Sequence, residues 1–189
     1  MKYTAITFVL GAFMASGVAL AQSPAAPNMP VDEVTKLITY TEVIDEPGMN
    51  KDTLYNRGLR WFKSYFKNPL QAIKNADAAA HQIDGGYKFV IKRPDPAAKK
   101  DPKPLVDAGL VNYKMKLLFK DGKFKYEVTS FAWAQTSYYP IERWMDTEAK
   151  NYDPNFALYL QQTDQYVKEM IESLATFIET EPVKKKDDW

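Results

Sequence analysis

The chain has 189 residues, with 25 basic and 24 acidic side chains and no cysteine. The absence of cysteine excludes disulfides, a thiolate nucleophile and cysteine-ligated zinc. The balanced charge excludes a general attraction to nucleic acid or to anionic membranes, and a hydrophobic fraction of 46% predicts a globular domain.

The first 21 residues have the layout of a secretory signal peptide. Lys2 is followed by an apolar stretch over residues 5–20, and residues 19–21 read Ala-Leu-Ala, an A-x-A cleavage site. We therefore expect export to the periplasm or the medium after removal of residues 1–21, with an uncleaved membrane anchor as the alternative. Because Gln22 stands where a lipoprotein needs cysteine, we expect no lipid anchor. No later segment has the roughly 20 apolar residues of a membrane helix.

The mature chain is expected to hold one domain. Residues 22–31, rich in proline and alanine, predict a flexible leader. Residues 32–181 are expected to form the single domain, and residues 182–189 a charged tail.

The first half of the domain is predicted to be a strand followed by a helix. Strand-forming residues cover 36–44, and the helix begins after Asn50, a capping residue, and ends at Asn68. A short helical turn is expected near residues 70–74. Gly58 lies on the apolar stripe of the helix, where glycine costs about 1 kcal/mol relative to alanine. This position predicts a close approach between helix and sheet.

The second half is predicted to be three strands and a long helix. Residues 78–92 are expected to be extended, with Asp84-Gly85-Gly86 as either a hairpin turn or a bulge, and residues 93–107 form a loop. A hairpin over residues 111–131 turns at Asp121-Gly122. An aromatic connector over residues 132–152 is expected to hold a short strand or turn. Apolar residues then recur every three to four positions and predict one amphipathic helix over 154–179, packed across the hairpin.

The two-residue turn sets the register of the hairpin. It places Phe119 opposite Phe124 on the face toward the core, and Lys116 opposite Glu127 on the other face.

Several short motifs resemble a family of exported bacterial proteins catalogued as a domain of unknown function with a TBP-like fold. They run from Val31-Asp32-Glu33 through residues 38–43 and Pro47-Gly48 to Leu54-Tyr55 and Trp61-Phe62. The resemblance implies an α+β fold: a curved antiparallel sheet with helices on one face, in the order β-α-β-β-β-α, with a long C-terminal helix. It implies no activity and no catalytic residue, and the name of the fold does not import DNA binding.

The outer face of the predicted sheet carries many lysines, which would attract anionic glycans or acidic proteins. The alternative is a solvated face whose lysines maintain solubility and discourage edge pairing. The lysines expected opposite the core are Lys88, Lys92, Lys114, Lys116, Lys120, Lys123 and Lys125.

The connector carries four aromatic side chains, Trp133, Tyr138, Tyr139 and Trp144. Exposed, they would suit sugar stacking or a protein contact; packed under the long helix, they belong to the core. Together with Lys88, Lys114, Lys116 and Lys125, they make up the candidate binding surface.

Catalytic and metal sites find little support in the sequence. His81 is the only histidine, and it would share a metal with Asp77 and Asp84 only if this stretch were helical. The carboxylates at residues 42–46 and at residues 146–148 are expected to be solvated rather than paired across a cleft. We expect no catalytic residue, no cofactor and no metal.

Two functions therefore compete. The first is an exported, non-enzymatic binding domain for a glycan or a protein. The second is a carrier that holds an apolar ligand in a groove between the sheet and the long helix. A hydrolase is the least favoured, because no serine elbow or nucleophile–histidine pair is present.

Overall fold

A computed structural model describes residues 26–180. Its main element is an antiparallel sheet of six strands in the order β1-β5-β4-β3-β2, with β6 paired to β5. The strands are β1 (Tyr40–Asp45), β2 (Ile73–Asp77), β3 (Gln82–Pro94), β4 (Leu105–Lys120), β5 (Lys123–Ala134) and β6 (Tyr138–Pro140). The helices are α1 (Lys51–Tyr65), α2 (Pro69–Ala72), the 3-10 helix η1 (Ile141–Met145) and α3 (Asn155–Thr180).

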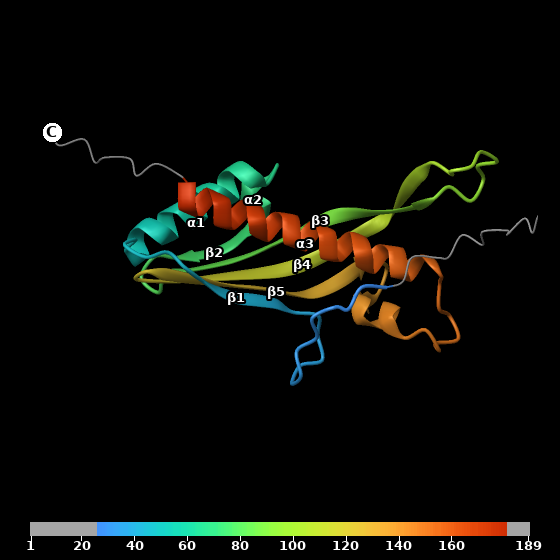
Figure 1. The fold of residues 1–189 in the computed structure, drawn as a ribbon, viewed down its shortest axis with the longest axis horizontal. Helices are drawn as coiled ribbons and strands as arrows, with labels where there is room; N and C mark the ends of the chain where they lie inside the picture. The colour runs from blue at the N-terminus through green and yellow to red at the C-terminus, as the bar shows by residue number, and fades with distance from the viewer. Residues whose placement is uncertain (1–25, 181–189) are drawn as a thin grey trace, which may run out of the picture.

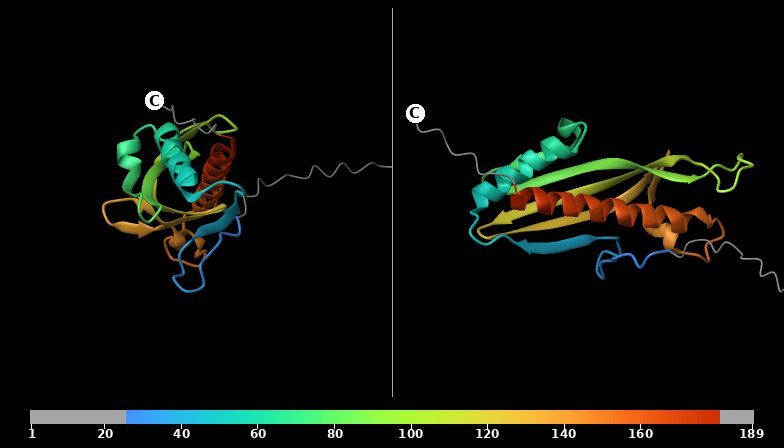
Figure 2. Two further views of the ribbon diagram at one scale, coloured as in Figure 1. Left: turned by 90° about the vertical axis from the view of Figure 1, so that its left-hand side faces the viewer. Right: turned by 45° about the horizontal axis from the view of Figure 1, so that its top comes forward.

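The molecule has two layers, because α1, α2 and α3 cover one face of the sheet (Figures 1 and 2). Over the middle of the sheet, the hydroxyl of Tyr113 on β4 donates to the sulfur of Met170 on α3 over 3.1 Å. Toward the Asp121-Gly122 turn, α1 lies directly on Phe119. The α+β class, the curved sheet with helices on one face and the long C-terminal helix agree with the prediction.

The predicted hairpin and its register are confirmed. Lys120 pairs with Lys123 around the turn, Phe119 with Phe124, and Lys116 with Glu127. The strands extend beyond the predicted 111–131 because β4 begins at Leu105 and pairs with β3 along an arm that projects from the body (Figure 1).

Both long helices are also confirmed. Asn50 caps α1 by accepting a hydrogen bond from the Thr53 N–H at 2.8 Å. α3 is unbroken over 26 residues and packs on the predicted face of the sheet, although α1 rather than α3 lies over Phe119. A Cβ atom on Gly58 would lie 2.5 Å from Cζ of Phe119, so the predicted close approach between helix and sheet is present.

The start of the domain differs from the prediction. The strand predicted over residues 36–44 begins only at Tyr40, because residues 33–35 form a turn and Lys36 has a positive φ of 60°. The last part of the expected leader is packed rather than flexible: Met29 is buried, and Pro30 accepts a hydrogen bond from the Thr39 N–H at 2.8 Å. The packed part of the chain therefore begins before Asp32.

A second difference lies around the first hairpin. Residues 73–77 form β2, which the sequence analysis did not predict, and residues 78–81 form the turn to β3 rather than part of an extended arm. Asp84-Gly85-Gly86 is continuous strand, and the pairing of β2 with β3 shifts between Ile73 and Asn75. The irregularity is therefore a bulge at Lys74 of β2, opposite the Asp84–Gly85 step of β3.

The predicted signal peptide and the tail over residues 182–189 lie outside the described residues. Within residues 26–180, no helix combines the length and the apolar character needed to cross a membrane.

Candidate functional site

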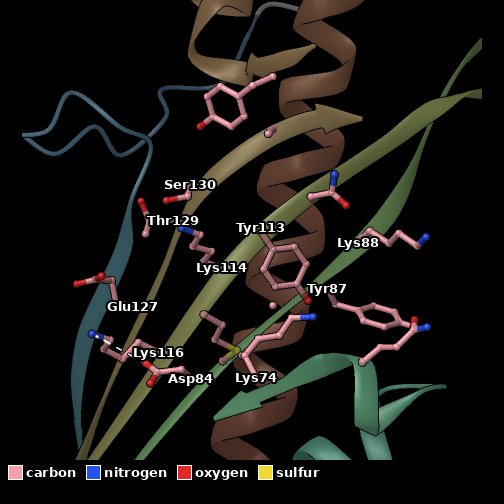
Figure 3. Close-up of a pocket in the computed structure, with 17 residues that line it drawn as sticks. Lys74, Asp84, Tyr87, Lys88, Tyr113, Lys114, Lys116, Glu127, Thr129 and Ser130 are labelled. Carbon is pink, nitrogen blue, oxygen red and sulfur yellow. Dashed lines mark ion pairs between the residues drawn. The ribbon is translucent and has the colours of Figure 1, made fainter. Parts of the chain in front are cut away.

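A broad hollow lies on the face of the sheet that the helices leave open (Figure 3). Its volume is about 1100 Å³. Side chains of β3, β4 and β5 form its floor and walls; Gln71 and Lys74 border it on one side, and Tyr138 of β6 borders it on another. This is the face on which the sequence analysis placed its candidate lysines.

Strand alternation explains why lysines point into the hollow. Along β4, Tyr113 and Met115 are buried toward the helices, whereas Lys114 and Lys116 are exposed on the opposite face. β3 repeats the pattern, with Phe89 buried and Lys88 exposed. The alternation of apolar residues that builds the core therefore also places the lysines together on the opposite face of the sheet.

In one row of side chains across β3, β4 and β5, the positive charge of the hollow is partly neutralised. Lys116 lies between Asp84 of β3 and Glu127 of β5, and its Nζ is 4.0 Å from Oδ1 of Asp84. Both partners are substantially exposed, so the pair contributes at most about 1 kcal/mol. Asp84 also accepts hydrogen bonds from the side-chain amides of Gln82 and Asn75.

The remaining three lysines of the hollow, Lys74, Lys88 and Lys114, make no ion pair within residues 26–180. Lys88 lies opposite Asn112, and Lys114 lies between Gly86 and Thr129. The hollow thus holds four lysines against two carboxylates, Asp84 and Glu127. We call this surface, with Lys74, Lys88, Lys114 and Lys116, the lysine hollow.

Hydroxyl groups and a bulge shape the side of the hollow on β5. The Thr129 hydroxyl lies 2.9 Å from the Thr39 hydroxyl and 3.2 Å from the carbonyl oxygen of Ile38, so it is held in place. Ser130 has a positive φ of 57°, and the β4–β5 register shifts beside it, between Asn112 and Lys114. The strand bends there, which turns its last residues toward β6 and Tyr138.

The four connector aromatics separate into exposed and packed groups. Tyr138 is 69% exposed and lines the hollow. Trp144 is fully buried and stacks on Phe156 of α3 at 5.6 Å between ring centroids, so it cannot form part of an exposed surface. Trp133 and Tyr139 are half-buried and contact each other edge to face. For Trp144 the interpretation as core is correct, because η1 and α3 enclose it.

Lys125 is not in the lysine hollow. It lies on the open face, but opposite Leu118 and Val43 in the row nearer the Asp121-Gly122 turn. Conversely, Lys74 and Gln71 line the hollow although the sequence analysis did not select them. Their position depends on the bulge of β2, which has no recognisable sequence signal.

His81 takes part in a local contact between two elements. Its Nε2 lies 2.6 Å from Oδ1 of Asp52, in the first turn of α1, and its ring meets Tyr55 edge to face. Within residues 26–180, no group of three histidine, aspartate or glutamate side chains is arranged to hold a metal ion. The hypothetical site of Asp77, His81 and Asp84 is therefore not assembled.

The space between α3 and the sheet is filled with side chains rather than open. Leu160, Val167, Met170 and Leu174 of α3 are fully buried among residues of the sheet. At one side of this core, the hydroxyls of Tyr113 and Tyr166 lie 3.2 Å apart. Burial, followed by the Tyr166 hydroxyl, raises the pKa of Tyr113 far above its ordinary value, so the phenol stays neutral. In the described part of the chain the core beneath α3 is therefore filled. The groove of about 560 Å³ that lies between α3 and the outer edge of β3 is lined by Asp164 and Glu169 as well as by apolar side chains, so it gives the carrier hypothesis little support.

Comparison with known proteins places this architecture in a family. A family model described as a domain of unknown function (DUF4468) with TBP-like fold matches residues 40–133, which span β1 to β5. Residues 40–133 are a DUF4468 domain. The resemblance noted from the sequence is thereby confirmed, and the lysine hollow lies almost entirely within the matched part.

Two solved structures share the fold of this DUF4468 protein. A DUF4468 family protein from Bacteroides ovatus aligns with a TM-score of 0.61 and 22% identity, over 80% of this chain and 94% of that one. A TBP-like protein from Parabacteroides distasonis aligns with a TM-score of 0.59 and 12% identity, over 76% and 94%. At these identities the likeness shows the fold alone. No curated protein matches the chain.

Proposed function

We propose that this DUF4468 protein is an exported, non-enzymatic binding module that takes an anionic chain molecule into the lysine hollow. The observation that carries the proposal is the unbalanced charge of the hollow, with four lysines against two carboxylates on the face of the sheet opposite α1, α2 and α3. The charge of the whole chain is close to zero, so this excess is local.

The shape of the hollow favours a chain over a small compact anion. It crosses three strands and runs from Lys74 at one side to Tyr138 at another, so its cations are spread out rather than convergent. Spread lysines attract a polyanion through several weak contacts, each of about 1 kcal/mol or less, which add up along the chain. Tyr138 offers an exposed ring, and Ser130 offers a hydroxyl.

The arrangement of the polar groups supports binding rather than catalysis. Among residues 26–180, the lining of the hollow includes neither a histidine nor a buried carboxylate. Asp84 and Glu127 lie in the same cross-strand row on either side of Lys116. Export rests on the signal-peptide layout of residues 1–21. A mature N-terminus at Gln22, measured by intact mass after expression in the native host, is the expected outcome.

The binding proposal is tested with two polyanions of different chemistry, poly-L-glutamate and polygalacturonate, measured by calorimetry at 50 and 300 mM salt. The double variant Lys88→Glu/Lys114→Glu is compared with Lys63→Glu/Lys150→Glu, which changes the net charge equally at exposed sites outside the hollow. We expect binding that weakens with salt. We also expect at least a roughly tenfold loss in the hollow variant, equivalent to about 1.4 kcal/mol, and little loss in the control.

The outcomes separate the possible ligands. Binding of polygalacturonate alone identifies a glycan, and binding of poly-L-glutamate alone identifies an acidic polypeptide. Equal losses in the hollow variant and in its control would show that net charge, not the lysine hollow, attracts polyanions. That result, or no binding of either polymer at 50 mM salt, would refute the proposal.

A further inference from the structure

We infer that the outer edge of β3, beside the lysine hollow, receives an extended acidic peptide segment as an additional strand. This inference rests on the proposed function and names the class of anionic chain that the hollow takes. It is carried by the backbone of β3, which plays no part in the charge argument above.

Within residues 26–180, most of β3 has no neighbouring strand on its outer side. β3 runs over residues 82–94 and pairs with β4 along its whole length, whereas β2 pairs only with residues 82–85. Beyond Gly85, the outer edge therefore presents backbone N–H and C=O groups without a strand partner in the described part of the chain. Such an edge is a template for pairing with another extended chain.

One residue of this edge already has a partner that imitates a strand. The side-chain amide of Gln162 on α3 accepts from the Lys92 N–H and donates to the Lys92 carbonyl, both at 2.8 Å. The N–H and C=O of Lys92 therefore point outward. The register shift between Ile91 and Lys92 places its extra residue, Ala108, on β4, so β3 itself keeps the regular alternation. The N–H and C=O of Val90 and Lys88 therefore point outward as well.

The groups at Val90 and Lys88 are accessible. Both residues are exposed, and among residues 26–180 neither backbone N–H receives a side-chain hydrogen bond like that of Lys92 with Gln162. The free stretch is bounded by Gln162 at Lys92 and by α2 and the bulge of β2 near Gly85. It accommodates a segment of about six residues, since a strand rises by roughly 3.4 Å per residue.

The two faces of this edge define the side chains of the added strand. On the open face, Lys88 and the rest of the lysine hollow favour acidic side chains (Figure 3). On the other face, a groove of about 560 Å³ runs between β3 and α3. Phe89, Leu158 and Tyr166 line it together with Asp164 and Glu169, whose negative charge disfavours acidic side chains there. Because side chains alternate along a strand, the segment that fits carries acidic and apolar residues in turn.

The probe is a capped hexapeptide of alternating glutamate and valine, with a lysine–valine hexapeptide as the charge control. Amide hydrogen exchange of the full mature chain is followed residue by residue by NMR. We expect the acidic peptide to slow exchange of the Lys88 and Val90 amides at least tenfold. The amide of Phe89, which already bonds to β4, should be unchanged.

A pair of variants isolates the backbone contribution. Val90→Pro removes the outward N–H, and an edge strand tolerates proline at such a position. Val90→Thr also changes the side chain but keeps the N–H. Circular dichroism and thermal melting confirm that both variants fold. We expect Val90→Pro to bind the acidic hexapeptide at least tenfold more weakly than Val90→Thr.

Equal affinities of Val90→Pro and Val90→Thr, or binding without protection of the Lys88 and Val90 amides, would overturn the inference. In that event, polygalacturonate binding that is lost in Lys88→Glu/Lys114→Glu would show that the lysine hollow is an anion site without an added strand, so the two proposals fail separately. If the acidic hexapeptide and the lysine hexapeptide bind equally, the acidic character of the segment is refuted.

Discussion

Gly58 tests the packing between α1 and the sheet, because two effects of known size oppose each other there. In Gly58→Ala, the gain in helix propensity is about 1 kcal/mol. The new Cβ would lie 2.5 Å from Cζ of Phe119, whereas ordinary contact begins near 3.4 Å, so the ring must move by about 1 Å. Phe119 is 4% exposed and its ring packs against Tyr55 and Phe124, which leaves it little room.

Overpacking of this kind costs about 1–3 kcal/mol. We therefore expect Gly58→Ala to lower the free energy of unfolding by about 1 kcal/mol in urea titration, with a fall in Tm of roughly 2–4 °C. In the background of Phe119→Leu, which replaces the ring by a shorter aliphatic side chain, Gly58→Ala should leave the free energy of unfolding unchanged or raise it. A Gly58→Ala protein that is more stable than the parent would show that Phe119 does not limit the approach of α1.

Two further predictions concern the junction of α1 with the end of α3. Arg57 is buried and donates hydrogen bonds to the carbonyls of Ile178 and Glu179. Arg57→Met should therefore lower the free energy of unfolding, measured in urea at pH 7, by about 2–3 kcal/mol. A loss below about 0.5 kcal/mol would contradict this prediction. Burial, and secondly the charge of Glu179, raise the pKa of Glu46 in the folded state. The folded chain then holds this proton at a pH where the unfolded chain has released it, so stability falls as pH rises from the ordinary value near 4.5 through the raised one. Glu46→Gln should therefore gain stability relative to the parent between pH 4 and pH 7, and an equal difference at both values would contradict the assignment.

The sequence predicts best those elements in which two local signals agree. For the β4–β5 hairpin, the Asp121-Gly122 turn and the alternation of apolar residues each specify the same register. For α3, a long helical period specifies both the element and its buried face. The lysines of β3 and β4 follow from the same alternation, so most of the lysine hollow was predictable.

The remaining features depend on contacts between distant residues. β2 contains Lys74, Asn75 and Asp77, which are poor strand formers, and it exists because β3 offers it hydrogen bonds. Met29 lies in a segment of low hydrophobicity, and it is buried in contact with Tyr40. The burial of Trp144 requires η1 to turn toward α3, which no local pattern indicates.

The contact of Arg57 with the last turn of α3 joins residues that are 121 positions apart. α3 is also the element that covers Tyr113 and Phe89 on the inner face of the sheet. A ribosome that delivers this chain from its N-terminus releases α3 after every strand of the sheet. The inner face stays open to solvent until α3 emerges, so its burial is the last step in the assembly of the described fold.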